Sequence, residues 1–278
     1  METVPAEREA GDAGLPPLCL SKIPIDCPGQ SDTLHVNMVH IKNPKGVNFS
    51  MKKKQCDLWE YVWFSSIVFA QLLKRLPIEE KEVLEIGCGG ALCSLTCALV
   101  TKNTKILATD LVEDALTIAK KSALANGLIG DRIAFERRNW EKLDVFEEAK
   151  YDLVIGSDVL FYRGAAPYVA KVIKKSISAK GVAIVCDPIR LNVEDFVGCL
   201  EESSDFHVDI RQFSDAIDSQ HIYNSISTEE EGGKAAFVQL KRAKLVLVKR
   251  KGGGETIEAE LKKRSIPPPQ KKFASPKK

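Results

Sequence analysis

The sequence has few of the residues that build metal centres or disulfide frameworks. Its four histidines are spread along the chain without ligand spacing, and none of its eight cysteines forms a C-x-x-C pair. We therefore expect no metal site. Cysteines scattered through apolar runs indicate small buried side chains in a reducing compartment, not disulfides.

Long apolar stretches are absent as well. No segment reaches the about 20 apolar residues that a transmembrane helix requires. Residues 1–17 are acidic and lack the apolar centre of a signal peptide. We expect no membrane association and a cytoplasmic location, with the nucleus as a second location.

The numbers of positive and negative residues are nearly equal, with a net charge of +2, but the charges are unevenly distributed along the chain. Residues 249–278 hold ten Lys/Arg against three Glu. We predict a disordered N-terminal segment at 1–30, a folded domain at 31–250 and a basic disordered tail at 251–278. The tail could dock an acidic partner, RNA or a nuclear-import receptor, or be solvated and without function.

The stretch that organises the chain is residues 83–92, VLEIGCGGAL. It reads as a buried strand, a glycine turn and the start of a helix. Gly87 and Gly89 would let a ligand approach the backbone, and the helix N-terminus would present N–H groups to it. A tight connection without a ligand fits the same pattern.

The next strand ends in Asp110, 23 residues after Gly87. An acid about 20 residues after such a turn accepts hydrogen bonds from ribose hydroxyls in nucleotide-binding α/β folds; its alternative role is a helix cap. The third glycine of a dinucleotide fingerprint is missing, because Leu92 stands there. Glu85 suits the cationic cofactor S-adenosylmethionine better than a pyrophosphate.

Strand and helix patterns alternate along most of the chain. Strands are predicted at 83–86, 104–110, 132–137, 151–158, 182–186, 206–211 and 243–248, with a further strand at 33–41. Helices are predicted at 67–76, 93–100, 113–126, 167–178 and 193–202. The fold class is therefore α/β, a Rossmann-like seven-stranded, mostly parallel sheet with helices on both faces. The last strand follows its predecessor without a helix, so it is antiparallel, and we expect it at the edge.

Five short motifs, in this order, resemble those of the class I seven-β-strand S-adenosylmethionine-dependent methyltransferases. Within that class, residues 55–250 resemble the methyltransferase-like protein-lysine methyltransferases of family 16. The motifs are Val62-Trp63 before a helix, Glu85-Ile-Gly-Cys-Gly, Asp110, Asn139-Trp140 and Gly156-Ser-Asp-Val-Leu-Phe-Tyr162. The chain departs from the pattern at four positions. Ala91 replaces a third glycine, Asn139 replaces Thr or Asp, Ser157 replaces Ala, and Phe161 replaces Tyr.

The resemblance implies a role for each matching residue. S-adenosyl-L-methionine would contact Trp63, Glu85, Gly87, Cys88, Gly89, Asp110, Asn139, Trp140 and Ser157. Asp158 would face the substrate as the catalytic carboxylate that aligns the amine, and Phe161 and Tyr162 would wall a substrate channel. Two alternatives remain: Asp158 could cap a turn, and the Trp63 region could be plain core.

The activity that the resemblance implies is methyl transfer to a protein side chain, most simply the lysine of a non-histone protein. Arginine remains open as the target, because the D-x-x-F variant occurs in a relative thought to methylate it. A small-molecule or nucleic-acid methyltransferase is a further alternative, although the N-P-P-Y type of motif is absent after the fourth strand. A non-catalytic protein that retains the fold is the last, and Ala91 supports it best.

Overall fold

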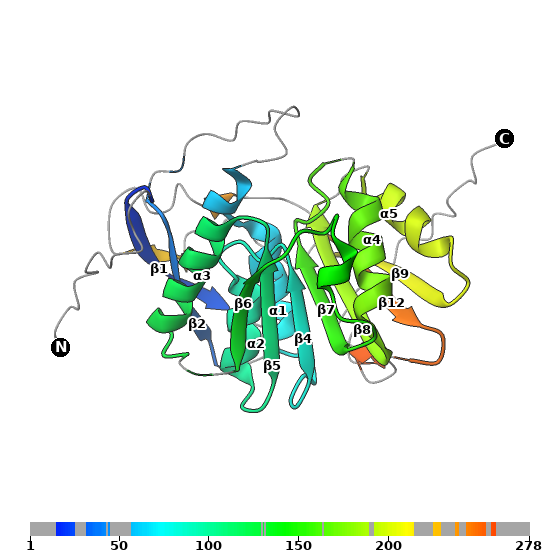
Figure 1. Ribbon diagram of the computed structural model, residues 1–278. Coiled ribbons are helices and arrows are strands. Elements are labelled where there is room, and N and C mark those ends of the chain that lie inside the picture. The colour runs from blue at the N-terminus through cyan, green and yellow to red at the C-terminus, as the bar shows by residue number, and fades with distance from the viewer. Residues whose placement is uncertain are drawn as a thin grey trace.

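The computed structural model describes residues 15–25, 32–42, 44, 57–128, 130, 132–162, 164–188, 192–213, 225–228, 237–238, 243–253 and 257–259. Within these ranges, the chain forms one large sheet with helices on both faces and two small sheets beside it (Figure 1).

The large sheet has seven strands in the order β6-β5-β4-β7-β8-β12-β9. Its parallel part consists of β4 (Glu82–Ile86), β5 (Lys105–Asp110), β6 (Ile133–Arg137), β7 (Tyr151–Ser157) and β8 (Ile177–Pro188). The last strand, β12 (Ala243–Arg250), is antiparallel to β8 and to β9 (Phe206–Phe213). The predicted fold class is therefore confirmed.

The position predicted for the reversed strand is wrong. β12 lies between β8 and β9, and β9 forms the edge. The burial of the two strands gives the physical reason. Residues 245–248 of β12 are at most 2% exposed, whereas the side chains of β9 are mostly half-buried or exposed. The more apolar strand takes the place where both of its edges are paired.

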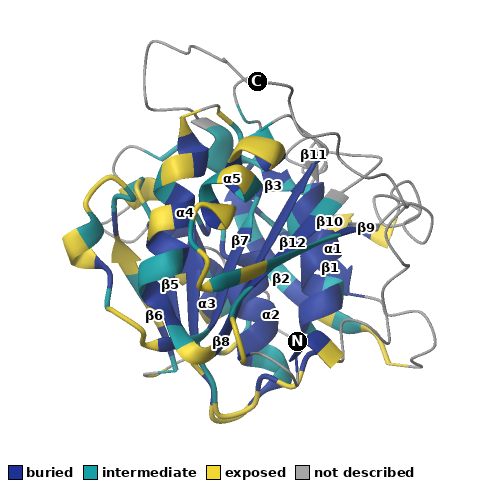
Figure 2. Ribbon diagram, turned by 90° about the vertical axis from the view of Figure 1, so that its right-hand side faces the viewer, coloured by how far each residue is buried: buried dark blue, intermediate teal, exposed yellow. Residues whose placement is uncertain are grey.

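Helices cover the two faces of the sheet in separate groups. Residues of α1 (Phe64–Leu73), α2 (Leu92–Val100) and α3 (Glu113–Ala125) share one apolar cluster with alternate residues of the strands. Residues of α4 (Ala165–Ser176) and α5 (Asn192–Glu201) share a second cluster with the other residues. Side chains alternate across a strand, so Val83 faces the first group and Leu84 the second. The central strands are buried along their length (Figure 2).

Smaller elements complete the fold. β1 (Leu18–Ile25) pairs with β2 (Leu34–Ile41) and with β10 (Ser227–Thr228), and β3 (Val62–Trp63) pairs with β11 (Phe237–Val238). Two short 3₁₀ helices are η1 (Asp57–Glu60) and η2 (Leu143–Val145). Among the described residues, no helix combines the length and the apolar character that crossing a bilayer requires.

The expectation that residues 1–30 are disordered is wrong for 18–25. These residues form β1, which pairs along its whole length with β2. Its buried side chains include Ile23 and Ile25, both 0% exposed, which join the cluster under α1 and α2. The predicted strand at 33–41 is confirmed as β2, whose Asn37 N–H donates to Asn126 Oδ1 at the end of α3 (2.9 Å).

The predicted domain end at residue 250 is also too early. Ile257 is buried in the cluster that α1 and α2 cover, and Glu258 forms an ion pair with Lys249 of β12. A buried isoleucine and a paired acid tie this part of the tail to the domain. Residues 260–278 lie outside the described residues, and so does the predicted docking of an acidic partner or RNA.

Candidate active site

The carboxyl ends of the parallel strands meet at one edge of the large sheet, and the predicted site residues follow them. Ile86 at the end of β4 pairs with Thr109 of β5 and with Gly156 of β7. Asp110 pairs with Arg137 at the end of β6. The structure therefore brings the strand ends that carry Gly87, Asp110, Asn139 and Ser157 to the same edge, where ligands bind in open parallel sheets.

The turn after β4 has a backbone that a ligand could approach closely. Gly87 and Gly89 have φ angles of +62° and +51°, which favour glycine. A Cβ at Gly87 would lie 2.9 Å from Cζ2 of Trp140 and 3.1 Å from Cγ1 of Val159. A Cβ at Gly89 would meet no atom within 4 Å. Trp140 thus lies against one side of the turn, and the backbone at Gly89 faces open space.

The residue that replaces the third glycine keeps the glycine conformation. Ala91 has φ +65° and precedes α2 as its N-cap. Its N–H donates to the Cys88 carbonyl (2.7 Å), and its methyl group is fully buried. The left-handed conformation costs an alanine about 1–2 kcal/mol. The turn therefore holds an alanine in a conformation that favours glycine.

Asp110 is bonded to this turn. Its Oδ2 accepts from the Gly89 N–H (2.9 Å), and its Oδ1 accepts from the Val112 N–H (3.0 Å). Burial raises the pKa of the Asp110 carboxyl. Each oxygen keeps a further lone pair, as acceptance from a vicinal diol would require. The contact with Val112 is not a helix cap, because Val112 is itself the N-cap of α3 and no side-chain bond caps that helix.

Glu85 lies beneath α2 and not at the surface of the turn. Its carboxylate accepts hydrogen bonds from the Ser94 N–H (3.0 Å) and from the Ser94 hydroxyl. The side chain is buried, and this burial raises the pKa of the Glu85 carboxyl from 4.5 to about 7. An acid at the first turn of α2 complements the dipole of that helix. Contact of Glu85 with the cofactor stays a prediction.

The buried Glu85 leads to a pH-dependent prediction for Glu85→Gln. A carboxyl with a raised folded pKa stabilises the fold fully below its unfolded value and loses this contribution as pH rises through the folded value. The stability of the wild type relative to the variant should therefore fall between about pH 4.5 and about pH 7. The 1.36 kcal/mol that corresponds to one pKa unit sets the change at about 3 kcal/mol. Urea unfolding of both proteins across this range would contradict the prediction if the two stability curves stayed parallel.

The loop after β6 carries Asn139 and Trp140. Oδ1 of Asn139 accepts from the Glu141 N–H (2.9 Å), which shapes a turn, and Trp140 packs against Gly87. Sequence reasoning missed what fixes this loop. The buried Arg138 guanidinium donates hydrogen bonds to the carboxylates of Glu136 (2.8 Å) and Glu147 (2.5 Å). The backbone N–H of Arg138 donates to the backbone carbonyl of Asp110 (2.9 Å).

The electrostatics of this network agree with its geometry. Hydrogen bonding to Arg138 lowers the pKa of the Glu147 carboxyl to about 2. Tyr151 also donates to Glu147 (2.9 Å), so the loop is tied back to the start of β7. The run of charged residues at 136–138 could have indicated an ion pair. The pairing of Arg138 with Glu147, nine positions later, depends on the tertiary structure.

Trp63 is the N-cap of α1 and is half-buried. Its indole N–H donates to the Leu58 carbonyl (2.9 Å), and its ring centroid lies 6.1 Å from that of Tyr61. The start of α1 is anchored at the end of β8, because the Cys186 thiol contacts the Ser65 carbonyl (3.5 Å). This end of α1 therefore lies at the same edge of the sheet as the glycine turn, and cofactor contact by Trp63 stays a prediction.

The turn after β7 carries Asp158, Phe161 and Tyr162. Asp158 has φ +56°, and its N–H donates to the Cys186 carbonyl (2.9 Å). Asp tolerates this left-handed conformation better than most residues. The aromatic rings of Phe161 and Tyr162 lie 5.0 Å apart, and Tyr162 is 40% exposed. The acid and both aromatic side chains thus belong to one short turn.

A second acid that sequence reasoning missed holds this turn. Asp187, at the end of β8, accepts from the Leu160 N–H through Oδ2 (3.0 Å) and is fully buried. Asn192, the first residue of α5, donates to the Leu160 carbonyl (2.8 Å). The sequence could have indicated this acid, because Asp187 directly follows the predicted strand 182–186, much as Asp110 ends the predicted strand 104–110.

Cys88 lies within the glycine turn but is buried, with its thiol near the Gly89 carbonyl (3.6 Å). Burial raises the pKa of this thiol, so it is not a reactive thiolate. Across the described part of the chain, no group of three or more His, Cys, Asp or Glu side chains could hold a metal ion.

These residues fit an adenosine-containing cofactor. Trp140 packs against one side of the glycine turn, and the turn is open at Gly89. At the end of the next strand lies Asp110, whose carboxylate accepts two backbone hydrogen bonds. An aromatic ring beside a glycine turn suits a purine, and an acid suits ribose. Binding of the adenosine at this edge stays a prediction.

The comparisons with known proteins agree with this geometry. The family described as lysine methyltransferase matches residues 42–203. The chain is 23% identical over 147 residues to the protein N-lysine methyltransferase METTL21A of Danio rerio, a match that covers 52% of this chain and 67% of that protein. It is 25% identical over 124 residues to the histidine protein methyltransferase 1 homolog of Dictyostelium discoideum, with 43% and 40% covered.

The chain thus spans about two thirds of the first relative and less than half of the second. Among solved structures, a ribosomal protein L11 methylase of Lactobacillus delbrueckii subsp. bulgaricus has a TM-score of 0.46 and 15% sequence identity. That comparison covers 66% of this chain and 77% of that chain. Because the family match covers more than half of the sequence, the chain belongs to the lysine methyltransferase family and is an S-adenosylmethionine-dependent methyltransferase.

Proposed function

We propose that this protein methylates the side-chain amine of a lysine in a non-histone protein. Family membership supports the proposal, as does the likeness to a relative named as a protein N-lysine methyltransferase. The observation that carries it is the position of Asp158. Its neighbour Val159 lies 3.1 Å from the Cβ position of Gly87, so the acid stands next to the glycine turn.

The rate of methyl transfer depends mainly on how well the amine is aligned with the methyl group. S-adenosylmethionine supplies an electrophilic methyl group. The chain's own residues must bring a neutral amine to it in line, and such positioning can supply much of the rate. In this proposal the Asp158 carboxylate accepts a hydrogen bond from the incoming amine and fixes its direction. Phe161 and Tyr162 then pack against the alkyl stem of the lysine.

The turn that presents Asp158 is held firmly enough for this role. Asp187 and Asn192 bond the N–H and the carbonyl of Leu160 from two different elements. The Asp158 backbone is in turn bonded to Cys186 of β8. A carboxylate on a turn fixed from both sides keeps its direction when a substrate arrives.

An experiment on the full chain tests the proposed substrate class. The purified protein is incubated with tritiated S-adenosylmethionine and a lysate of its source cells, and the products are treated separately with protease and with nuclease. We expect label in a protein band that protease removes and nuclease leaves. Label that only nuclease removes, or label confined to small molecules, would contradict the proposal.

A further inference from the structure

One edge of the large sheet ends in a long strand. β9 pairs with β12 at all eight of its positions, and within the described residues no strand pairs with its other side. Figure 1 shows the sheet ending at β9, and Figure 2 looks onto that side of the molecule. The outward-pointing N–H and C=O groups of an edge strand can pair with a further strand.

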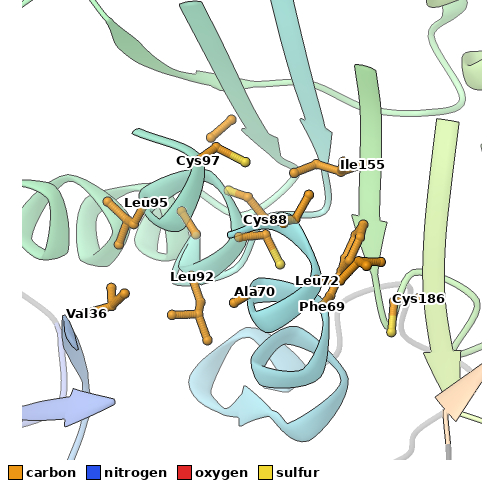
Figure 3. Packing of buried hydrophobic residues seen from close by; sticks show 14 of the residues in the cluster. Val36, Phe69, Ala70, Leu72, Cys88, Leu92, Leu95, Cys97, Ile155 and Cys186 are labelled. Atoms are coloured by element: carbon orange, nitrogen blue, oxygen red, sulfur yellow. The ribbon is translucent and has the colours of Figure 1, made fainter. Parts of the chain in front are cut away.

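The strand next to β9 is fixed on both faces of the sheet. Residues 245–248 of β12 belong alternately to the two apolar clusters. Figure 3 shows Cys186 of β8 and Phe69 of α1 in the first of these clusters. At the start of β9, the Arg250 guanidinium lies 4.9 Å from the centre of the Phe206 ring. β9 is therefore held in an extended form, and a strand that pairs with it does not have to order its backbone first.

Two opposite charges alternate along β9. Asp209 and Arg211 are two positions apart, so their side chains point to the same face of the sheet. They form an ion pair at 2.7 Å, and the Asp209 side chain is 24% exposed. Many edge strands carry charges that repel a second copy of the strand. Because the two charges here have opposite signs, a second copy of β9 can attract them.

Antiparallel pairing of β9 with β9 of a second copy brings these charges together. A two-fold axis through Ile210 places Asp209 of each copy opposite Arg211 of the other. Opposite charges in directly opposed positions stabilise a strand pair, and like charges destabilise it. An axis through Asp209, or one through Arg211, would oppose two like charges. The charges therefore favour the register that is centred on Ile210.

The other edge of the sheet lacks this pattern. β6 has five residues, and its two charged residues, Glu136 and Arg137, are adjacent and point to opposite faces. Glu136 also forms an ion pair with Arg138 of the same chain. Pairing of two β6 strands centred on Phe135 would oppose Glu136 to Ala134 and form no ion pair. Self-complementary charge is thus a feature of β9.

We propose that two copies of this protein associate through β9, with Ile210 at the two-fold axis and Asp209 of each copy paired with Arg211 of the other. The two large sheets then continue into one sheet across the interface. β9 runs parallel to β8, because β12 is antiparallel to both strands. The carboxyl ends of the parallel strands therefore lie at opposite edges of the joined sheet in the two copies. β8 and β12 separate the interface from β7, so neither candidate site lies within it.

Charge exchange in β9 tests this geometry by analytical ultracentrifugation. The wild type should form a dimer whose population rises with concentration. Asp209→Arg opposes arginines across the axis, and Arg211→Asp opposes aspartates, so each variant alone should dimerise at least about tenfold more weakly. An equimolar mixture of the two variants should form a heterodimer, because every aspartate in it faces an arginine. Circular dichroism verifies that each variant is folded.

Lys105→Glu is the matched control. It also reverses one member of a surface ion pair, with Glu82 at 3.7 Å, but it lies on β5, far from β9 in the strand order. It should dimerise as the wild type does. A wild type that stays monomeric over the whole concentration series would overturn the proposal, as would undiminished dimerisation of both β9 variants or a mixture that forms no heterodimer. The wild-type measurement decides the matter if a β9 variant does not fold.

Discussion

Asp158→Asn should lower single-turnover methyl transfer at least 100-fold and leave the affinity for S-adenosylhomocysteine unchanged. The asparagine keeps the shape of the side chain and tolerates the φ angle of +56°. It removes the negative charge that would strengthen the hydrogen bond from the incoming amine, and it places an amide NH₂ group where a carboxylate oxygen stood. Misplacement of the reacting amine costs catalysis about 100-fold. Calorimetry for the cofactor product and rapid-quench methylation measure the two quantities separately.

Asp152→Asn serves as the control for this variant. Asp152 lies near the opposite end of the same strand, where its Oδ2 accepts from the Glu82 N–H (3.1 Å). This change should cost some stability and leave turnover intact. If a folded Asp158→Asn protein turned over at the wild-type rate, Asp158 would only cap its turn, and the amine would have to be aligned by other groups.

Gly87→Ala should weaken S-adenosylhomocysteine binding more than tenfold. The added Cβ would lie 2.9 Å from the Trp140 ring and 3.1 Å from Val159, so one of them must move. The φ angle of +62° adds backbone strain of about 1–2 kcal/mol. Both effects act on the turn and on the aromatic wall that we assign to the adenosine. Equilibrium titration of the folded variant provides the measurement.

Gly127→Ala separates strain from displacement of Trp140. Gly127 follows α3 with a φ angle of +68°, and a Cβ there would meet no atom within 4 Å. This control should lose about as much stability to backbone strain and bind S-adenosylhomocysteine normally. If both variants bound the ligand equally well, Trp140 would be a core residue and not a wall of the cofactor site.

The sequence was sufficient to predict the large sheet, because its central strands are buried on both faces and read as apolar runs. The same reasoning failed for β1, where Pro24 and Lys22 conceal the buried positions, and for β12, whose place between two strands depends on a tertiary comparison with β9. The start of β8 was also missed. Its first residues continue directly from α4, and the glycine at 181 lies within the strand.

The site residues could be predicted where a sequence motif determines the backbone conformation. Hydrogen bonds between residues far apart in the sequence could not be predicted. The positions of Gly87, Asp110 and Asp158 follow from strand ends and turn chemistry. The sequence could not show that Glu85 would turn beneath α2 to bond Ser94, because that depends on how the helix packs. The clamp of Asp187 on the Leu160 N–H is equally tertiary, since 27 positions separate the two residues.

Tandem mass spectrometry of the methylated substrate tests the central claim most directly. The full chain is incubated with S-adenosylmethionine that carries a trideuterated methyl group, the labelled protein is isolated, and the modified side chain is identified from its fragments. We predict trideuteromethyl groups on the side-chain nitrogen of lysine, and at least 100-fold slower labelling when Asp158→Asn replaces the wild type. Label on arginine or histidine in the wild-type reaction, or equal lysine labelling by Asp158→Asn, would contradict the account.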